Sequence, residues 1–341
     1  MKTFEIVLSE ERNVTLTMYL NLESREFHHT ARPLMVVLPG GGYAMCSDRE
    51  AEIVALQYMA VGYQAAVLRY TLRDKGGWPH PINDYDQAME YIAAHAEEWH
   101  IDMDHTATVG FSAGGHLAAC TATIAKHKPR GAICVYPAIL ADILDGCQPD
   151  MPRPHEHVSG DTSPCYIVTV RDDGLVNCKN SLVFALALEE KGVQFETHVY
   201  SYGNHGFSVG TPAIYYGSIS PRVSEWVSGS IGWLEEIMGA FTDKGFTKPV
   251  LERTLFSDGE PFLSVNCSLK HILAQPEEVQ TLVKPLKDGL RAFAEKSGFT
   301  YEGLCSFVGS YTLRTLLETL LIPQEKIEEL NKGLKTIPNT L

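Results

Sequence analysis

The stretch Gly110-Phe111-Ser112-Ala113-Gly114-Gly115 is the part of this sequence that decides its fold. It follows the β-branched run at residues 106–109 and precedes an alanine-rich run at residues 116–120. A Gly-x-Ser-x-Gly spacing between a strand and a helix is typical of a sharp turn that exposes a serine hydroxyl at the edge of a sheet. Glycine suits the positions two residues before and after the serine, because side chains there would crowd the turn. We therefore predict that Ser112 is a nucleophile.

A serine hydroxyl needs a neighbouring base, and the base needs an acid that orients it. The chain order expected with this turn is serine, acid, histidine. His205 follows the last predicted strand in the glycine-containing run at residues 203–207. Asp172 and Asp173 follow the strand before it. We favour Asp173 because Val176, three positions later, would anchor the turn beneath the sheet, and we leave open whether Asp172 assists.

Backbone amides for a developing oxyanion are predicted at two places. One is the N–H of Ala113, and the other is the pair Gly41 and Gly42 in the run Pro39-Gly40-Gly41-Gly42-Tyr43. A flexible turn or a phosphate loop is the alternative for this run, but no Gly-Lys-Ser/Thr follows it. Four further side chains are candidates for a substrate pocket, with aromatic faces suited to a sugar ring, although core packing or loop anchoring explains each at least as well: Tyr43, Arg69, Tyr70 and Trp78.

Short β-rich runs alternate with helical patterns from residue 34 to about residue 240. This alternation predicts an α/β fold with a mostly parallel, doubly wound sheet. The opening runs at residues 4–8 and 14–20 predict an antiparallel hairpin at its edge. The remaining predicted strands are 34–38, 63–70, 106–111, 131–136, 165–170 and 195–200, and the clearest predicted helices are 50–60, 82–98 and 181–188.

The pattern changes after Gly239. Residues 282–294, 311–321 and 324–334 place apolar side chains at three- and four-residue intervals, which predicts helices. We find no internal repeat in this part. The sequence therefore predicts two domains: an α/β-hydrolase catalytic domain over residues 1–243 and a small helical domain of unknown role over residues 250–341.

Composition narrows the class of protein. The 341 residues are 45% hydrophobic and 21% charged, as in ordinary globular proteins. The net charge of −14 disfavours nucleic acid and anionic membranes as partners. The start of the chain lacks the apolar core of a signal peptide, so we expect a cytoplasmic protein. The 8 scattered cysteines indicate reduced thiols, and His155-Glu156-His157 lacks a third ligand, so we expect no metal and no cofactor.

Together these motifs resemble the bacterial acetyl-xylan-esterase-like (acetyl esterase/lipase) branch of the α/β-hydrolases, over residues 1 to about 240. The runs that carry the resemblance are 39–43, 47–51, 68–70, 110–117, 173–176 and 203–207. The resemblance implies esterase chemistry, with Gly41 and Gly42 matching the His-Gly-Gly-Gly loop of related lipases. Pro39 stands where those enzymes have histidine, and Asn177 stands where family members usually carry proline. The C-terminal part is similar to small helical appendages behind some bacterial carbohydrate-active enzymes.

We therefore predict a serine carboxylic-ester hydrolase that removes short acyl groups such as acetyl from carbohydrate or xylo-oligosaccharide esters through an acyl-enzyme. Ser112 would attack, His205 would carry the proton and Asp173 would orient the imidazole. Two alternatives are a serine peptidase of the prolyl-oligopeptidase kind, whose large N-terminal propeller we do not find before residue 34, and a non-catalytic binding protein of the same fold. Acyl length, the alcohol, and assembly into a homo-oligomer stay open.

Overall fold

The computed structural model describes residues 1–22, 24, 26–149, 151–215, 217–249 and 261–339. The chain divides into two compact units, Met1–Val250 and Leu251–Leu341. That the second unit is a separate domain with a role of its own stays a prediction.

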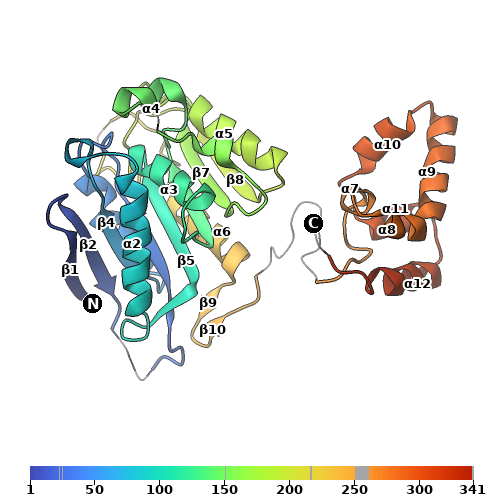
Figure 1. Cartoon of the computed structure of the whole chain (residues 1–341), viewed down its shortest axis with the longest axis horizontal. Helices are drawn as coiled ribbons and strands as arrows, with labels where there is room; N and C mark the ends of the chain where they lie inside the picture. Colours follow the sequence, from blue (N-terminus) through green and yellow to red (C-terminus); the bar gives the residue numbers. More distant parts are fainter. Residues whose placement is uncertain (23, 25, 150, 216, 250–260, 340–341) are drawn as a thin grey trace. The chain divides into compact units, whose positions relative to one another are not determined.

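One sheet organises the first unit, with strand order β1-β2-β4-β3-β5-β6-β7-β8 (Figure 1). β1 pairs antiparallel with β2, and β2 with β4, whereas all later neighbours are parallel. The predicted α/β fold with an antiparallel hairpin at its edge is thereby confirmed. The strands are β1 (Lys2–Ser9), β2 (Val14–Leu20), β3 (Arg32–Leu38), β4 (Gln64–Arg69), β5 (Ile101–Phe111), β6 (Gly131–Val135), β7 (Cys165–Val170) and β8 (Phe195–Tyr200).

Burial along the strands follows their place in the sheet. β3 is buried at every residue and nearly all apolar, as expected for a parallel strand covered on both faces. β1 instead alternates between exposed and half-buried positions over most of its length, because it lies at the edge. The apolar centre of the sheet thus provides a rigid base for the loops that follow β3, β5, β7 and β8.

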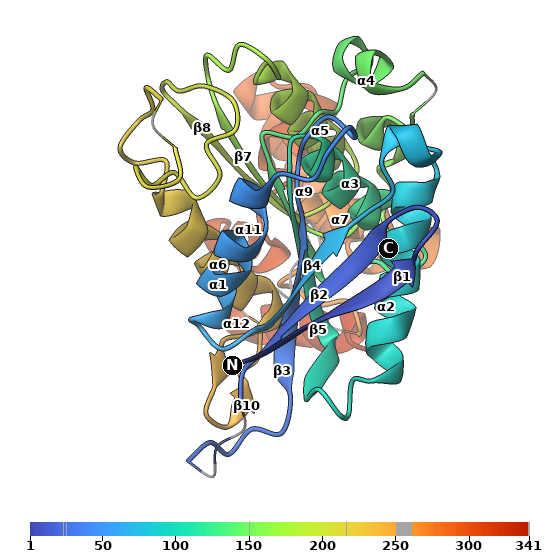
Figure 2. The same cartoon turned by 90° about the vertical axis from the view of Figure 1, so that its left-hand side faces the viewer.

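Helices cover the sheet on both faces (Figure 2). One face packs against α2 (His80–Ala94), α3 (Ala113–Thr123) and α5 (Lys179–Glu190), and the other packs against α1 (Glu52–Met59) and α6 (Glu225–Met238). A short helix, α4 (Ala141–Cys147), follows β6. The smaller elements are η1 (Asp48–Glu50), η2 (Arg73–Lys75), η3 (Pro154–His157) and the hairpin β9 (Phe241–Thr242) with β10 (Gly245–Phe246).

The second unit is helical and encloses an apolar core of its own. Its helices are α7 (Leu269–Leu273), α8 (Glu277–Leu282), α9 (Lys284–Ser297), α10 (Tyr301–Val308), α11 (Leu313–Thr319) and α12 (Gln324–Leu334). Pro285 lies in the first turn of α9, where its missing N–H costs no helical hydrogen bond.

Two helices of this unit begin with similar short runs of sequence. Ser-Leu-Lys-His-Ile-Leu begins at Ser268, and Thr-Leu-Arg-Thr-Leu-Leu begins at Thr312. Each first residue caps its helix, since the Ser268 hydroxyl accepts from the backbone N of His271 and the Thr312 hydroxyl accepts from that of Thr315. The two residues also face each other across an antiparallel bridge.

Candidate active site

Ser112 lies on the turn between β5 and α3, with φ 53° and ψ −114°. Residues other than glycine rarely adopt a positive φ, and such strain persists only where the surroundings hold it. Gly110 and Gly114 allow the main chain around Ser112 to pack closely enough to hold this conformation. A Cβ on Gly110 would lie 2.0 Å from the carbonyl oxygen of Gly114, and a Cβ on Gly114 would lie 2.0 Å from that of Leu38. The two glycines therefore let α3 begin directly against the ends of β3 and β5.

The structure brings Ser112, His205 and Asp173 together. His205 Nε2 lies 2.8 Å from Ser112 Oγ, and its Nδ1 lies 2.7 Å from Asp173 Oδ2. A carboxylate only accepts hydrogen bonds, so Nδ1 holds the ring proton and Nε2 accepts from the serine hydroxyl. The Tyr136 ring packs edge-on against the imidazole, with ring centroids 4.8 Å apart. The histidine is thus held in the tautomer that can accept the proton of the serine.

The two neighbouring aspartates make different contacts. The Asp173 side chain is completely buried, and its Oδ1 accepts from the backbone N atoms of Leu175 and Val176, at 2.9 and 2.8 Å. These bonds orient the other oxygen toward His205. Asp172 Oδ1 accepts from the backbone N of Gly203 at 2.8 Å, which ties the start of the histidine loop to the end of β7. Asp172 therefore contacts the loop and not the imidazole.

A cavity of about 570 Å³ opens beside the serine. Its lining includes Gly41, Gly42 and Ala113, which were predicted as amide donors, together with Ser112 and His205. Apolar side chains from α4 and its surroundings and from the acid turn complete much of the wall: Ala138, Ile143, Cys147, Leu175 and Val176. The volume is within the range of small-molecule sites.

The glycine loop after β3 is anchored at two successive residues. Tyr70 donates its hydroxyl proton to the carbonyl oxygen of Pro39, with the oxygens 2.6 Å apart. The backbone N of Gly40 donates to Glu50 Oε2 at 2.9 Å. A Cβ on Gly40 would lie 2.6 Å from the same carboxylate oxygen, so only glycine permits this approach. These contacts hold the loop although Pro39 replaces the histidine of related enzymes.

Glu50 also reaches the histidine loop. Its Oε1 accepts from the Tyr136 hydroxyl at 2.7 Å, and that hydroxyl oxygen accepts from the backbone N of Ser208 at 3.0 Å. Burial of the Glu50 carboxyl raises its pKa, and the bonds from Tyr136 and Gly40 oppose this effect. One buried carboxyl group therefore connects the loop after β3 to the loop that holds His205.

Comparison with known proteins agrees with this geometry. The BD-FAE family model matches residues 19–136. A solved structure of an α/β hydrolase enzyme from a Medee basin deep-sea metagenome library is 34% identical, with a TM-score of 0.65; the match covers 70% of our chain and 98% of that one. The chain belongs to the α/β-hydrolase family.

Two curated relatives of this α/β hydrolase are named for xylan. An endo-1,4-beta-xylanase B of Butyrivibrio fibrisolvens is 31% identical over 219 residues, which are 54% of our chain and 34% of that protein. An acetylxylan esterase of Xylanibacter ruminicola is 25% identical over 251 residues, 66% of our chain and 50% of that protein. The chain thus spans between a third and a half of these relatives. The predicted resemblance to the acetyl-xylan-esterase-like branch is confirmed.

The four residues predicted to line a substrate pocket in this hydrolase lie outside the wall of the cavity. Tyr43 is buried and its hydroxyl lies 2.7 Å from His116 Nδ1, and Tyr70 anchors Pro39 as described above. Arg69 pairs with Asp48 at 2.6 Å, and Trp78 packs its ring edge-on against that of His116. Their positions support the alternative of packing and loop anchoring. A residue that is close to the glycine loop in sequence need not point its side chain into the cavity.

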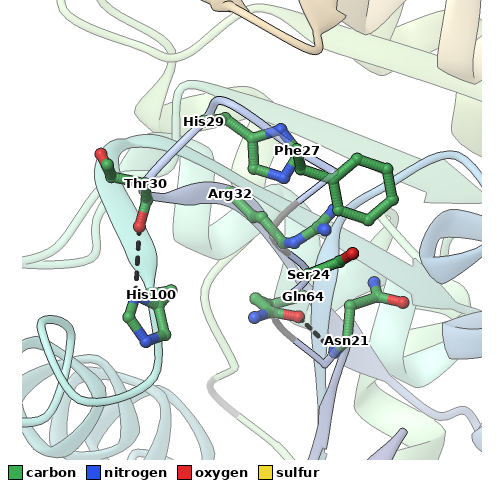
Figure 3. A pocket seen from close by; sticks show the side chains of 8 residues that line it. All are labelled: Asn21, Ser24, Phe27, His29, Thr30, Arg32, Gln64 and His100. Atoms are coloured by element: carbon green, nitrogen blue, oxygen red, sulfur yellow. Dashed lines mark hydrogen bonds between the residues drawn. The ribbon is translucent and has the colours of Figure 1, made fainter.

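The hydrolase has a second, smaller pocket of about 200 Å³, shown in Figure 3. It is lined by residues such as Arg32 and Gln64, which begin β3 and β4. It therefore lies at the amino ends of these strands, whereas Ser112 follows the carboxyl end of β5. Ligands of open parallel sheets bind at the carboxyl ends, so the cavity beside Ser112 is the candidate active site.

Neither a metal site nor a membrane span stands out in the described ranges. No group of three or more histidine, cysteine or acidic side chains there could hold a metal ion. No helix in these ranges is long and apolar enough to cross a membrane. The 8 cysteines all lie in these ranges, and none of them forms a disulfide there.

Sequence analysis missed Glu50, Arg49 and Tyr136, which contact the loops of the site or line its cavity. Glu50 lies within a run that carried the family resemblance, but its partners Gly40 and Tyr136 are 10 and 86 residues away. One available signal was a carboxylate two positions before the apolar helix α1, because a carboxylate buried there needs a partner.

Proposed function

We propose that this α/β hydrolase is a serine carboxylic-ester hydrolase that removes short acyl groups, acetyl among them, from carbohydrate esters such as acetylated xylo-oligosaccharides. The observation that carries the proposal is the unbroken hydrogen-bonded chain from Ser112 through His205 to Asp173 beside a cavity. The relatives named for xylan support the choice of substrate. The cavity has room for a sugar unit.

In the first half of the reaction, Ser112 Oγ attacks the ester carbonyl carbon while His205 Nε2 takes the hydroxyl proton. The carbonyl oxygen becomes an oxyanion, which the N–H groups of Gly41, Gly42 and Ala113 stabilise. The carbon–oxygen bond to the alcohol then breaks, and His205 returns the proton to the leaving oxygen. Asp173 stabilises the imidazolium that exists between these two transfers. The product is an acyl-serine.

In the second half, a water molecule replaces the alcohol. His205 takes a proton from the water, which attacks the acyl carbon, and the same amides hold the second oxyanion. The bond to Ser112 breaks, the serine recovers its proton from His205, and the carboxylic acid leaves. No cofactor enters this scheme, and all residues that it uses belong to the first unit.

The test is acetate release from acetylated xylo-oligosaccharides and from p-nitrophenyl acetate. Ser112→Ala should abolish both reactions and covalent labelling by a fluorophosphonate probe. Ser228→Ala is the matched control, because Ser228 is an exposed residue of α6 that bonds only within its helix. Turnover by Ser112→Ala at the wild-type rate would refute the serine mechanism. If the enzyme cleaves p-nitrophenyl acetate but releases no acetate from the oligosaccharides, the esterase activity is supported and the carbohydrate substrate is refuted.

A further inference from the structure

Arg49 is the one lysine or arginine among the described residues that line the cavity beside Ser112. Its side chain is exposed, and its Nη2 lies 3.4 Å from the point where a Cβ on Gly206 would stand. The guanidinium therefore lies against the residue that follows His205. Ser208 donates its hydroxyl proton to the Arg49 carbonyl oxygen, which fixes the main chain of Arg49 to the histidine loop.

The Arg49 guanidinium forms no ion pair in the part of the chain that the structure describes, since no carboxylate oxygen there lies within 4.0 Å of it. The neighbouring acids are engaged elsewhere: Asp48 pairs with Arg69 at 2.6 Å, and Glu50 bonds to Gly40 and Tyr136.

The position of Arg49 indicates which part of a substrate it meets. His205 must protonate the leaving oxygen, so the alcohol part of the ester lies over His205. Gly206 follows directly, and Arg49 packs against Gly206. The acyl part instead occupies space nearer the predicted oxyanion amides. The cation thus lies on the side of the alcohol.

Asp142 of α4 is the opposite charge in the same wall. It is exposed, and its Oδ1 accepts from the backbone N of Ile143 at 3.1 Å. Glu50 also lines the cavity, but its carboxyl oxygens are occupied by protein donors. Among the described residues, the wall therefore offers an incoming anion one cation that forms no ion pair, and this cation lies beside the histidine loop.

We propose that Arg49 selects ester substrates whose alcohol part carries a carboxylate, such as an acylated sugar acid or an acylated oligosaccharide with a uronate substituent. The guanidinium pairs with that carboxylate and orients the leaving oxygen toward His205. This inference rests on the proposed esterase function and specifies its substrate class.

The experiment compares 3-acetoxybenzoate with 3-acetoxybenzamide, which share the ring and the acetyl ester and differ in charge. In Arg49→Gln, the ratio of kcat/KM for the acid to that for the amide should fall about three- to tenfold, as expected for a partly exposed ion pair. Hydrolysis of the amide should fall by less than hydrolysis of the acid, because only the acid loses the ion pair. In the wild type, the ratio should also fall as salt is raised, because salt screens an exposed pair.

Two variants keep the outcome specific. Arg49→Lys should retain part of the ratio, because it keeps the charge and loses the bidentate geometry. Arg130→Gln makes the same charge change just before β6, at the opposite end of the strand from the site, and should leave the ratio unaltered. An unchanged ratio in Arg49→Gln, or an equal loss on both substrates, refutes the selection by charge. Failure of the wild type to hydrolyse either ester refutes the esterase function itself.

Discussion

Replacing Glu50 should slow the reaction although Glu50 does not belong to the serine–histidine–aspartate chain. Its two carboxyl oxygens accept from the Gly40 amide at 2.9 Å and from the Tyr136 hydroxyl at 2.7 Å. Glu50→Gln keeps the size of the side chain but has a single acceptor oxygen, so one of the two donors loses its partner. If Gly40 is released, the glycine loop can move away from Ser112.

The structure sets the size of the effect. A buried donor without a partner costs about 1–3 kcal/mol, so Glu50→Gln should lower the free energy of unfolding by about that amount and Glu50→Ala by about twice as much. Loss of one oxyanion donor lowers kcat about 100- to 1000-fold. Because the loop of Glu50→Gln is loosened and its amides remain, we expect a fall in kcat of about tenfold to a hundredfold.

The assay is the hydrolysis of p-nitrophenyl acetate by Glu50→Gln, with urea unfolding of the same sample. KM should change much less than kcat, since the oxyanion amides act mainly on the transition state and the rest of the cavity wall stays in place. Glu98→Gln, an exposed residue in the turn after α2, controls for the loss of one negative charge. A folded Glu50→Gln enzyme with the kcat of the wild type would refute the reasoning, because the glycine loop would then need no anchor at Gly40.

Three further predictions concern the site and its supports. Asp173→Asn should lower kcat by about 10⁴-fold, because the imidazole would be held in the wrong tautomer. Asp172→Asn should lower kcat by about tenfold or less, because Asp172 does not contact the imidazole. Steady-state kinetics of both variants measures the difference. Gly114→Ala should lower the free energy of unfolding in urea by about 3 kcal/mol or more, because its Cβ would meet a main-chain oxygen. Gly174→Ala is the control, because a Cβ there meets open space. Burial lowers the pKa of His116 from 6.5 to about 4, so unfolding takes up a proton below pH 6.5, and the free energy of unfolding should fall as the pH drops from 6.5 toward 4. His116→Gln should flatten this fall in unfolding curves measured across that range.

Much of the fold was predictable because its signals are local. Short β-rich runs of sequence marked every parallel strand, and the change of pattern after Gly239 marked the helical part. The end of α2 was less predictable. The sequence indicated a helix over residues 82–98, but α2 ends at Ala94 and the chain turns through His100, which has a φ of 52°. The apolar spacing continues into this turn because Trp99 is buried there against β1.

The residues of the candidate active site also divide into those that the sequence predicted and those that it did not. Ser112, Asp173 and His205 follow strand ends, so chain order alone predicted that they would meet, and the structure brings them within hydrogen-bonding distance. The wall of the cavity was not predictable, since it depends on α4 and on the segment before α1, which approach the serine only in the folded chain. Tyr43 and Tyr70 were near the right loop in sequence, yet their side chains point into the protein, where hydroxyl groups find buried partners.

The short segment before α1 links both sides of the proposed reaction. Glu50 holds Gly40, at the start of the predicted oxyanion loop, and through Tyr136 it supports Ser208 in the histidine loop. The Arg49 carbonyl accepts from the same serine, so two adjacent residues set the separation between the amides and the base. The side chains of Arg49 and Glu50 have different roles. The buried carboxyl group of Glu50 fixes the geometry, and the exposed guanidinium of Arg49 is free to meet substrate. A change of specificity at Arg49 therefore need not disturb the chemistry that Glu50 positions.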